Sequence, residues 1–276
     1  MDSVDSRRAI ADLSAAFVAD LRALPAEAWS GPSDCAGWSV AALFVHVTQV
    51  AELLQDSLAR GRSGDPGPPA RAAAEGVQGW RAWRAGELAR RAAQAPAELL
   101  DEYQVSAAQL EREFDAIAAA PPAAQAWHPA GPRPLDWFVA QWLFELALHD
   151  WDFRVAADPS ADLRAGCQPA FARTLPARLA RGFGGADDPA LAGRFRIELA
   201  CEAPLVLLAR VGDGRVEVEA ADGVAPADFT IQSDPAAFGL VMTNRRPASQ
   251  FEAAGRWRAF GDAARAAAFA GAFKSY

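Results

Sequence analysis

Residues 145–152 read ELALHDWD, and they lie within a long apolar segment in which ionisable side chains are costly to bury. This segment predicts one long helix over residues 135–156. Residues four apart lie one turn apart on the same face of a helix, so Glu145 and His149 are expected to project side by side. A carboxylate and an imidazole that converge on one point suggest a metal site.

Helical spacing of apolar residues continues upstream of this segment. Apolar residues recur at helical spacing over residues 5–24, and Ser39 can cap a second helix. Residues 73–93 and 97–119 predict two further helical stretches that break near a proline. Together these segments predict an all-helical, metal-binding bundle over residues 1–160.

The sequence pattern changes in the last third of the chain. Residues 195–199 alternate between apolar and polar side chains, and residues 215–219 do the same after an Asp-Gly turn. Strict alternation is typical of half-buried strands. We therefore expect a small α+β domain over residues 190–276, with residues 161–189 as a connecting segment.

Composition limits the classes of partner. The 276-residue chain has a formal net charge of −8 and no basic run, which argues against nucleic acid or an anionic membrane surface. No apolar run reaches the roughly 20 residues that cross a bilayer, and we expect a cytoplasmic protein. The three cysteines lack the CxxC spacing of thiolate zinc sites, and they are interpreted mainly as buried small hydrophobic residues.

Histidine occurs only three times, so histidine-based chemistry has few candidates. His46 lies on the apolar side of the second predicted helix, from which it could meet Glu145 and His149 across the bundle. The alternative is structural: His46 would be a hydrogen-bonded core residue, and Glu145 would pair with an arginine such as Arg84 or Arg154.

A His-Glu-His set suits Zn²⁺ and leaves a fourth tetrahedral position open, although nickel or iron could use the same ligands. Asp152 shares a helix face with His149 at i+3 and is expected to orient it or to approach the metal. Asp150 points elsewhere and is expected to be exposed. His128, in a predicted loop, is interpreted as a surface residue, and Cys35 as an inert buried thiol.

These motifs resemble a known family. Residues 145–152 look like the Glu-x-x-x-His-x-x-Asp signature of the mycothiol-dependent maleylpyruvate isomerase family. Trp29, the CAGWSV segment at residues 35–40 and the following His46 resemble that family's upstream motifs, and residues 227–231 resemble part of its C-terminal domain. The resemblance implies a DinB-like four-helix bundle followed by a small sterol-carrier-like α+β domain.

The resemblance also implies a site and an activity. It implies zinc bound by His46, Glu145 and His149, and an arginine of the C-terminal domain that faces the site. Arg245 and Arg246 are the nearest matches by position, whereas Arg256 keeps the family's Gly-Arg pair further along the chain. The implied cosubstrate is mycothiol or another low-molecular-weight thiol.

The activity implied by the resemblance is that of a zinc- and thiol-dependent isomerase or S-transferase. A zinc-bound thiolate would add to an activated small molecule, and elimination after bond rotation would complete an isomerisation. Two alternatives stay open. The chain could be a carrier for an apolar ligand with a structural metal site, or it could be a zinc hydrolase that uses hydroxide at the open position.

Overall fold

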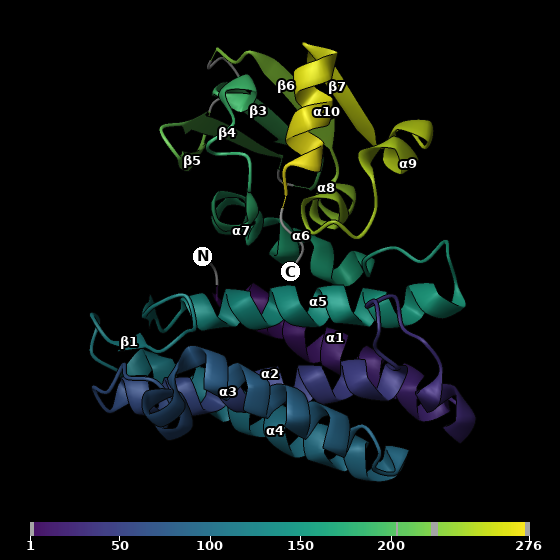
Figure 1. Ribbon diagram of the computed structural model, residues 1–276, viewed down its shortest axis with the longest axis vertical. Coiled ribbons are helices and arrows are strands. Elements are labelled where there is room, and N and C mark those ends of the chain that lie inside the picture. The colour runs from purple at the N-terminus through teal and green to yellow at the C-terminus, as the bar shows by residue number, and fades with distance from the viewer. Residues whose placement is uncertain (1–2, 203, 222–225, 274–276) are drawn as a thin grey trace. The chain divides into compact units, whose positions relative to one another are not determined.

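A computed structural model describes residues 3–202, 204–221 and 226–273, and the chain divides into two compact units, Asp2–Arg164 and Ala165–Tyr276. The N-terminal unit is mostly helical (Figure 1). Its elements, in chain order, are α1 (Ser3–Ala23), η1 (Ala26–Ser30), α2 (Val40–Arg62), α3 (Ala70–Arg91), α4 (Pro96–Ala116), η2 (Ile117–Ala119), β1 (Gln125–Ala126), β2 (Arg133–Pro134) and α5 (Trp137–Ala157). Helix α2 contacts α3, α4 and α5, and α1 contacts α5.

Local sequence signals set several boundaries of these helices. The Ser39 hydroxyl accepts a hydrogen bond from the Ala42 N–H at 3.1 Å and so caps α2, as the sequence predicts. Pro96 begins α4, where its missing N–H leaves no helical hydrogen bond unmade. Gly76 interrupts α3 with a φ of 74°, a left-handed conformation that glycine adopts without a steric penalty.

Aromatic side chains fix the helices of the N-terminal unit against one another. The Phe17 ring meets Phe44, Tyr103 and Phe153 edge to face, with centroids 5.6, 6.4 and 5.9 Å apart, and all four side chains are buried. Such pairs contribute about 0.5–1.5 kcal/mol each beyond the apolar area that they bury. They come from α1, α2, α4 and α5, so the packing sets the placement of the two helices that carry the predicted metal ligands.

The C-terminal unit is an α+β domain built on a five-stranded sheet. Its described elements are η3 (Ala165–Cys167), α6 (Gln168–Ala172), α7 (Leu175–Gly182), η4 (Pro189–Leu191), β3 (Gly193–Leu199), β4 (Leu205–Gly212), β5 (Arg215–Ala220), β6 (Phe229–Ser233), α8 (Pro235–Met242), α9 (Ala248–Ala253), β7 (Trp257–Gly261) and α10 (Ala263–Gly271). The strand order is β5-β4-β3-β6-β7, and only the β3–β6 pair is parallel among these strands. Phe269 of α10 covers Phe195 and Phe229 of the sheet, with ring centroids 5.0 and 5.8 Å apart.

The predicted fold class is confirmed: a mostly helical N-terminal region precedes a C-terminal α+β domain. The four-helix bundle of the resemblance is extended, because the described N-terminal unit contains five α-helices. Residues from Ala165 onward belong to the C-terminal unit, where α6 and α7 occupy much of the segment that the sequence suggests as a connection. Among the described residues, no helix combines the length and apolarity needed to cross a membrane.

Candidate metal centre

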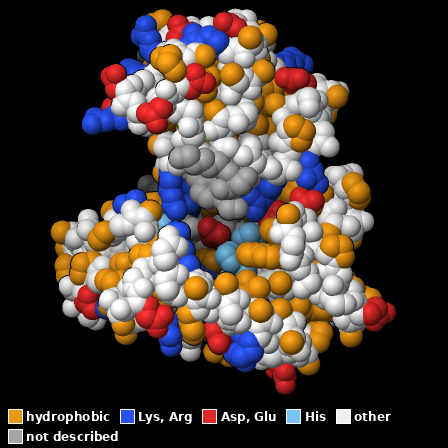
Figure 2. Space-filling model, viewed as in Figure 1, with side chains coloured by type: hydrophobic (Ala, Val, Ile, Leu, Met, Phe, Trp, Pro, Cys, Tyr) orange, Lys and Arg blue, Asp and Glu red, His pale blue; other side chains and the backbone are white. Residues whose placement is uncertain are grey.

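Three side chains from two helices converge in the N-terminal unit. His46 comes from α2, Glu145 and His149 come from α5, and one potential ligand atom of each lies within 4.8 Å of the others. His149 Nε2 is 3.5 Å from Glu145 Oε2, and the centroids of the two imidazole rings are 4.9 Å apart. His149 is buried, whereas His46 and Glu145 are half-buried, and histidine side chains are visible on this unit in Figure 2. The fold thus brings together the three residues of the predicted ligand set.

Neighbouring side chains hold two of these residues in place. Gln141, one turn before Glu145 on α5, donates a hydrogen bond to Glu145 Oε1 at 2.6 Å. The Trp38 ring lies against the His46 ring, with centroids 4.8 Å apart and an interplanar angle of 48°. Glu145 Oε2 therefore faces His149 while Oε1 is engaged by an amide, which is how outer contacts commonly orient a ligating carboxylate.

Asp152 lies on the other side of the His149 ring. Asp152 Oδ2 is 2.9 Å from His149 Nδ1, and the Asp152 carboxylate is almost fully buried. A proton on Nδ1 that is donated to this carboxylate leaves the Nε2 lone pair directed toward His46 and Glu145. Carboxylates in this position commonly orient metal-bound imidazoles, so the predicted contact between Asp152 and His149 is present, and a supporting role for Asp152 stays a prediction.

Asp152→Asn is expected to lower zinc affinity by about 10- to 100-fold, the usual effect of removing the carboxylate behind a ligating histidine. An amide keeps the shape of the side chain but lacks the negative charge with which the Asp152 carboxylate supports the His149 ring. Competition with a chromophoric chelator measures the affinity. An unchanged dissociation constant in a folded variant would show that Asp152 does not support His149.

Burial and nearby charges push the pKa values of the two histidines apart. Burial, followed by the charge of His149, lowers the pKa of His46 to about 3. Burial also opposes the charged form of His149, but hydrogen bonds with Asp152, Cys35 and Glu145 hold its pKa well above the usual value. Without a metal, the charged form is therefore disfavoured at His46 and favoured at His149, which lies between two carboxylates.

Cys35 also lies at this site, although its position in the sequence predicts only an inert buried thiol. Cys35 Sγ lies 3.2 Å from Asp152 Oδ2 and 4.0 Å from His149 Nδ1, and the side chain is half-buried. The loop that carries it is tied to α5 by the Asp34 N–H, which donates to the Asp152 carbonyl at 3.1 Å. Cys35, His149 and Asp152 thus form a second group whose potential ligand atoms lie within 4.8 Å of one another.

Two other expectations about this region are wrong. Asp150 is fully buried rather than exposed, because Arg154 and Arg164 both donate to its carboxylate at 2.8–3.0 Å. His128 is also buried rather than at the surface; its Nδ1 accepts from the Ala130 N–H at 3.1 Å, and its ring meets Trp137. His128 belongs to neither of the two ligand groups found among the described residues.

The candidate arginines lie in the C-terminal unit. Arg245 and Arg246 follow α8 and line a pocket of about 760 Å³ in that unit. Arg256 makes a bidentate ion pair instead, with its Nε and Nη2 2.7 and 2.8 Å from the Asp234 carboxylate oxygens. Asn244 has a φ of 56°, a left-handed conformation that glycine favours and asparagine tolerates.

Family models match both parts of the chain. The mycothiol maleylpyruvate isomerase N-terminal domain matches residues 10–154, and the SCP-2 sterol transfer family matches residues 189–274. The first match covers more than half of the chain, so the chain belongs to the mycothiol maleylpyruvate isomerase family, an enzyme family. The resemblance seen in the sequence is confirmed.

Two solved structures share this fold. The crystal structure of the mycothiol-dependent maleylpyruvate isomerase superposes with a TM-score of 0.61 at 13% identity, covering 89% of this chain and 90% of that chain. A histidine-to-alanine mutant of the isomerase gives a TM-score of 0.61 at 13% identity, covering 90% and 91% of the two chains. At this identity the likeness establishes the fold alone. No curated protein matches the sequence.

Proposed function

We propose that this protein is a zinc- and thiol-dependent isomerase or S-transferase that acts on an activated, acidic small molecule. The observation that carries the proposal is the convergence of His46, Glu145 and His149 in a chain of the maleylpyruvate isomerase family. Mycothiol is the proposed thiol, because the structurally similar isomerase is mycothiol-dependent.

The residues present fit Zn²⁺. Two imidazoles and one carboxylate are ligands that zinc prefers, and their spacing within 4.8 Å suits a shared ion with one position left open. When bound, zinc would lower the pKa of a thiol at that position and so supply a thiolate nucleophile at neutral pH. Gln141 and Asp152 would hold Glu145 and His149 in the ligating orientation.

Arg245 and Arg246 are the proposed ligands for a substrate carboxylate, which a guanidinium can bind through two parallel hydrogen bonds. Their position supports this assignment, because both line the pocket of about 760 Å³ in the C-terminal unit, whereas Arg256 lines a different pocket of that unit.

The test of this function combines metal analysis with a turnover assay. The purified protein should contain about one zinc per chain and should convert maleylpyruvate to its trans isomer only when mycothiol is added. Zinc with thiol consumption, but without isomerisation, would identify an S-transferase. Turnover that needs no thiol would instead indicate a zinc hydrolase and would contradict the proposal.

The raised pKa of His149 predicts that zinc binding depends on pH. Zinc needs the Nε2 lone pair, so binding must release the proton that His149 carries in the metal-free protein. His46, with a pKa of about 3, is already neutral and releases none. Zinc affinity should therefore rise about tenfold per pH unit from pH 6.5 until the pH reaches the raised pKa of His149, and then level off.

Calorimetric titration of zinc in buffers with different ionisation enthalpies measures this proton release. About one proton per zinc is expected from His149 at pH 6.5. A protein that binds zinc without releasing a proton would show that His149 is neutral before the metal arrives.

Cobalt substitution distinguishes the two ligand groups that share His149. If His46 and Glu145 complete the site, the Co²⁺ protein should lack the strong thiolate-to-cobalt charge-transfer absorption, because Cys35 stays outside the coordination sphere. Cys35→Ser should then leave the cobalt spectrum unchanged. A charge-transfer band that disappears in Cys35→Ser would place the metal among Cys35, His149 and Asp152.

A carrier function is the second candidate, and the match of residues 189–274 to the SCP-2 sterol transfer family favours it. In that case the C-terminal unit would bind an apolar ligand, and the metal would be structural. Removing zinc from a carrier would leave ligand binding intact, whereas removing it from the proposed enzyme would abolish turnover.

A further inference from the structure

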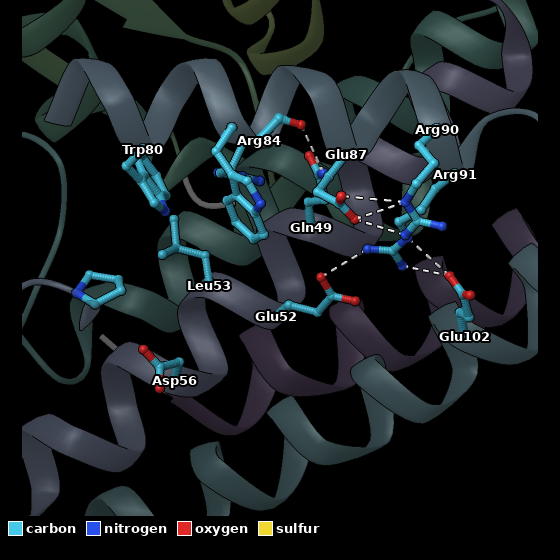
Figure 3. Close-up of a pocket in the computed structure, with 12 residues that line it drawn as sticks. Gln49, Glu52, Leu53, Asp56, Trp80, Arg84, Glu87, Arg90, Arg91 and Glu102 are labelled. Atoms are coloured by element: carbon cyan, nitrogen blue, oxygen red, sulfur yellow. Dashed lines mark hydrogen bonds and ion pairs between the residues drawn. The ribbon is translucent and has the colours of Figure 1, made fainter. Parts of the chain in front are cut away.

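A pocket of about 460 Å³ opens between α2 and α3 in the N-terminal unit (Figure 3). Leu53 and Trp80 give it apolar walls, and Trp80 is buried in a cluster with Ala72 and Trp127. Its position on α2 relates it to the candidate metal centre, because the lining residue Gln49 lies one helical turn beyond His46. The Gln49 amide donates to the Arg84 carbonyl at 3.1 Å and so ties α3 to α2 at this point.

Arg84 differs from the other charged residues of this pocket in having a buried donor without an acceptor in the described part of the chain. Its side chain reaches from α3 toward Gln49 and Leu53 of α2 (Figure 3), and its guanidinium carbon lies 5.1 Å from the centroid of the Trp80 ring. Nη2 of Arg84 is buried and has no hydrogen-bond acceptor among the described residues. Buried donors are seldom left unpaired in folded proteins, so a pocket-lining arginine that carries such a donor is a candidate for binding a ligand.

The other pocket arginines already have carboxylate partners. Arg91 donates to Glu52 at 3.0 Å and to Glu102 at 2.7 Å, and Arg90 donates to Glu87 at 2.8 Å. Arg90 balances the charge of Glu87, whereas Arg91 is shared by Glu52 and Glu102 and balances one of these two charges. The remaining acidic residue that lines the pocket, Asp56, is exposed and therefore screened by solvent.

Arg84 is also electrostatically coupled to the metal ligands. Burial lowers the pKa of Arg84 to about 10, while the charges of Glu52 and Glu145 oppose that effect, so the guanidinium remains a cation at neutral pH. Arg84 in turn adds to the effects of burial and His149 that depress the pKa of His46. The pocket therefore presents a positive charge within electrostatic reach of the predicted ligands.

We propose that the α2–α3 pocket binds a carboxylate-bearing small molecule, with the Arg84 guanidinium as the donor to one carboxylate, and that this molecule is the acidic substrate of the adjacent centre. This carboxylate is distinct from the one assigned to Arg245 and Arg246. The cation–π contact with Trp80 holds the guanidinium before the ligand arrives, and the apolar walls accommodate the carbon chain. This inference rests on the proposed function for the identity of the ligand, although the pocket and its donor are independent of it.

The test measures binding of maleate, a small dicarboxylate, to the full-length, zinc-loaded protein by calorimetry. Arg84→Met, which removes the charge and keeps much of the length, should weaken maleate binding about 10- to 100-fold, the range for losing a charged hydrogen bond. The matched control is Arg81→Met, an exposed arginine one turn earlier on α3, which should stay within twofold of the wild type. Equal maleate affinity in Arg84→Met and the wild type would overturn the proposal.

A second variant covers the case in which Arg84→Met does not fold. Leu53→Trp fills the pocket from α2 with Arg84 unchanged, and it should weaken maleate binding by at least tenfold. Unchanged binding in that folded variant would place maleate elsewhere and overturn the proposal.

Two further ligands test whether Arg84 binds the carboxylate of the substrate or that of the thiol cosubstrate. Dimethyl maleate, which has the same carbon skeleton without charge, should bind the wild type and Arg84→Met equally. N-acetylcysteine, a thiol with a carboxylate, should likewise bind both equally; a loss confined to this thiol would assign Arg84 to the cosubstrate and overturn the assignment to substrate. If turnover requires the thiol but maleate binding does not depend on Arg84, this inference is refuted and the proposed function stands. If maleate binding depends on Arg84 but no turnover is found, the proposed function is refuted and this inference stands.

Discussion

His149→Ala is expected to remove zinc from the protein and to reduce thiol-dependent turnover by more than about 100-fold, beyond the effect typical of residues that only support a metal ligand. His149 is the residue that both candidate ligand groups share, so its loss removes a donor whichever group holds the metal. The substitution also leaves two carboxylates, Glu145 and Asp152, without the imidazole that lies between them. Metal analysis after desalting, followed by the maleylpyruvate assay, measures both losses.

His128→Ala is the matched control for this variant. His128 is buried to the same degree as His149, because each residue is 7% exposed to solvent. His128 belongs to neither ligand group among the described residues. It should keep zinc and turnover while sharing any general effect of removing a buried imidazole. A His149→Ala protein that loses zinc but retains thiol-dependent turnover would refute the enzyme mechanism and favour a structural metal.

The parts of the site that sequence could predict are those fixed by one helix. The i,i+4 relation of Glu145 and His149 and the i,i+3 relation of His149 and Asp152 follow from helical geometry alone. The structure shows both pairs in contact, at 3.5 and 2.9 Å. His46 needed one further step, the inference that the apolar face of its helix points into the bundle.

Cys35 could not be placed in the same way, because its position depends on contacts distant in sequence. The hydrogen bond from the Asp34 N–H to the Asp152 carbonyl, 118 residues away by number, brings the loop against α5. Gly37, with a φ of 81°, allows the turn that follows. The CAGW segment lies just before the helix of His46, which indicates that Cys35 is near that helix. A loop has no periodicity, however, so the direction of the Cys35 side chain could not be inferred.

The prediction that Asp150 is exposed assumes that α5 has one buried face. The helix contacts both α1 and α2, and most of its residues are buried around the whole circumference. A nearly continuous apolar run was the available signal, since a helix that is apolar all round is a buried one. The second partner of the carboxylate, Arg164, lies in the segment after α5 and was not predictable from the helix itself.

Asp150→Asn is expected to destabilise the N-terminal unit by about 3 kcal/mol, the lower end of the range for removing one partner of a buried ion pair. The Asp150 carboxylate is fully buried and neutralises two guanidinium groups, from Arg154 at 2.9 Å and Arg164 at 2.8 Å. The amide keeps the volume of the side chain but removes the buried charge that both guanidinium groups share. The arginines are partly exposed, so water and the neighbouring Asp20, 2.5 Å from Arg164, limit the loss.

Urea unfolding followed by tryptophan fluorescence measures this effect, because every tryptophan except Trp257 lies in Asp2–Arg164. The measurement is made on zinc-free protein, so that metal binding does not add to the free energy of unfolding. Asp12→Asn, at an exposed position of α1, removes the same charge and should change stability by less than about 0.5 kcal/mol. If the two variants unfolded at the same urea concentration, the Asp150 ion pairs would contribute nothing to the free energy of unfolding beyond the change in net charge. The packing of α5 would then rest on its apolar contacts alone.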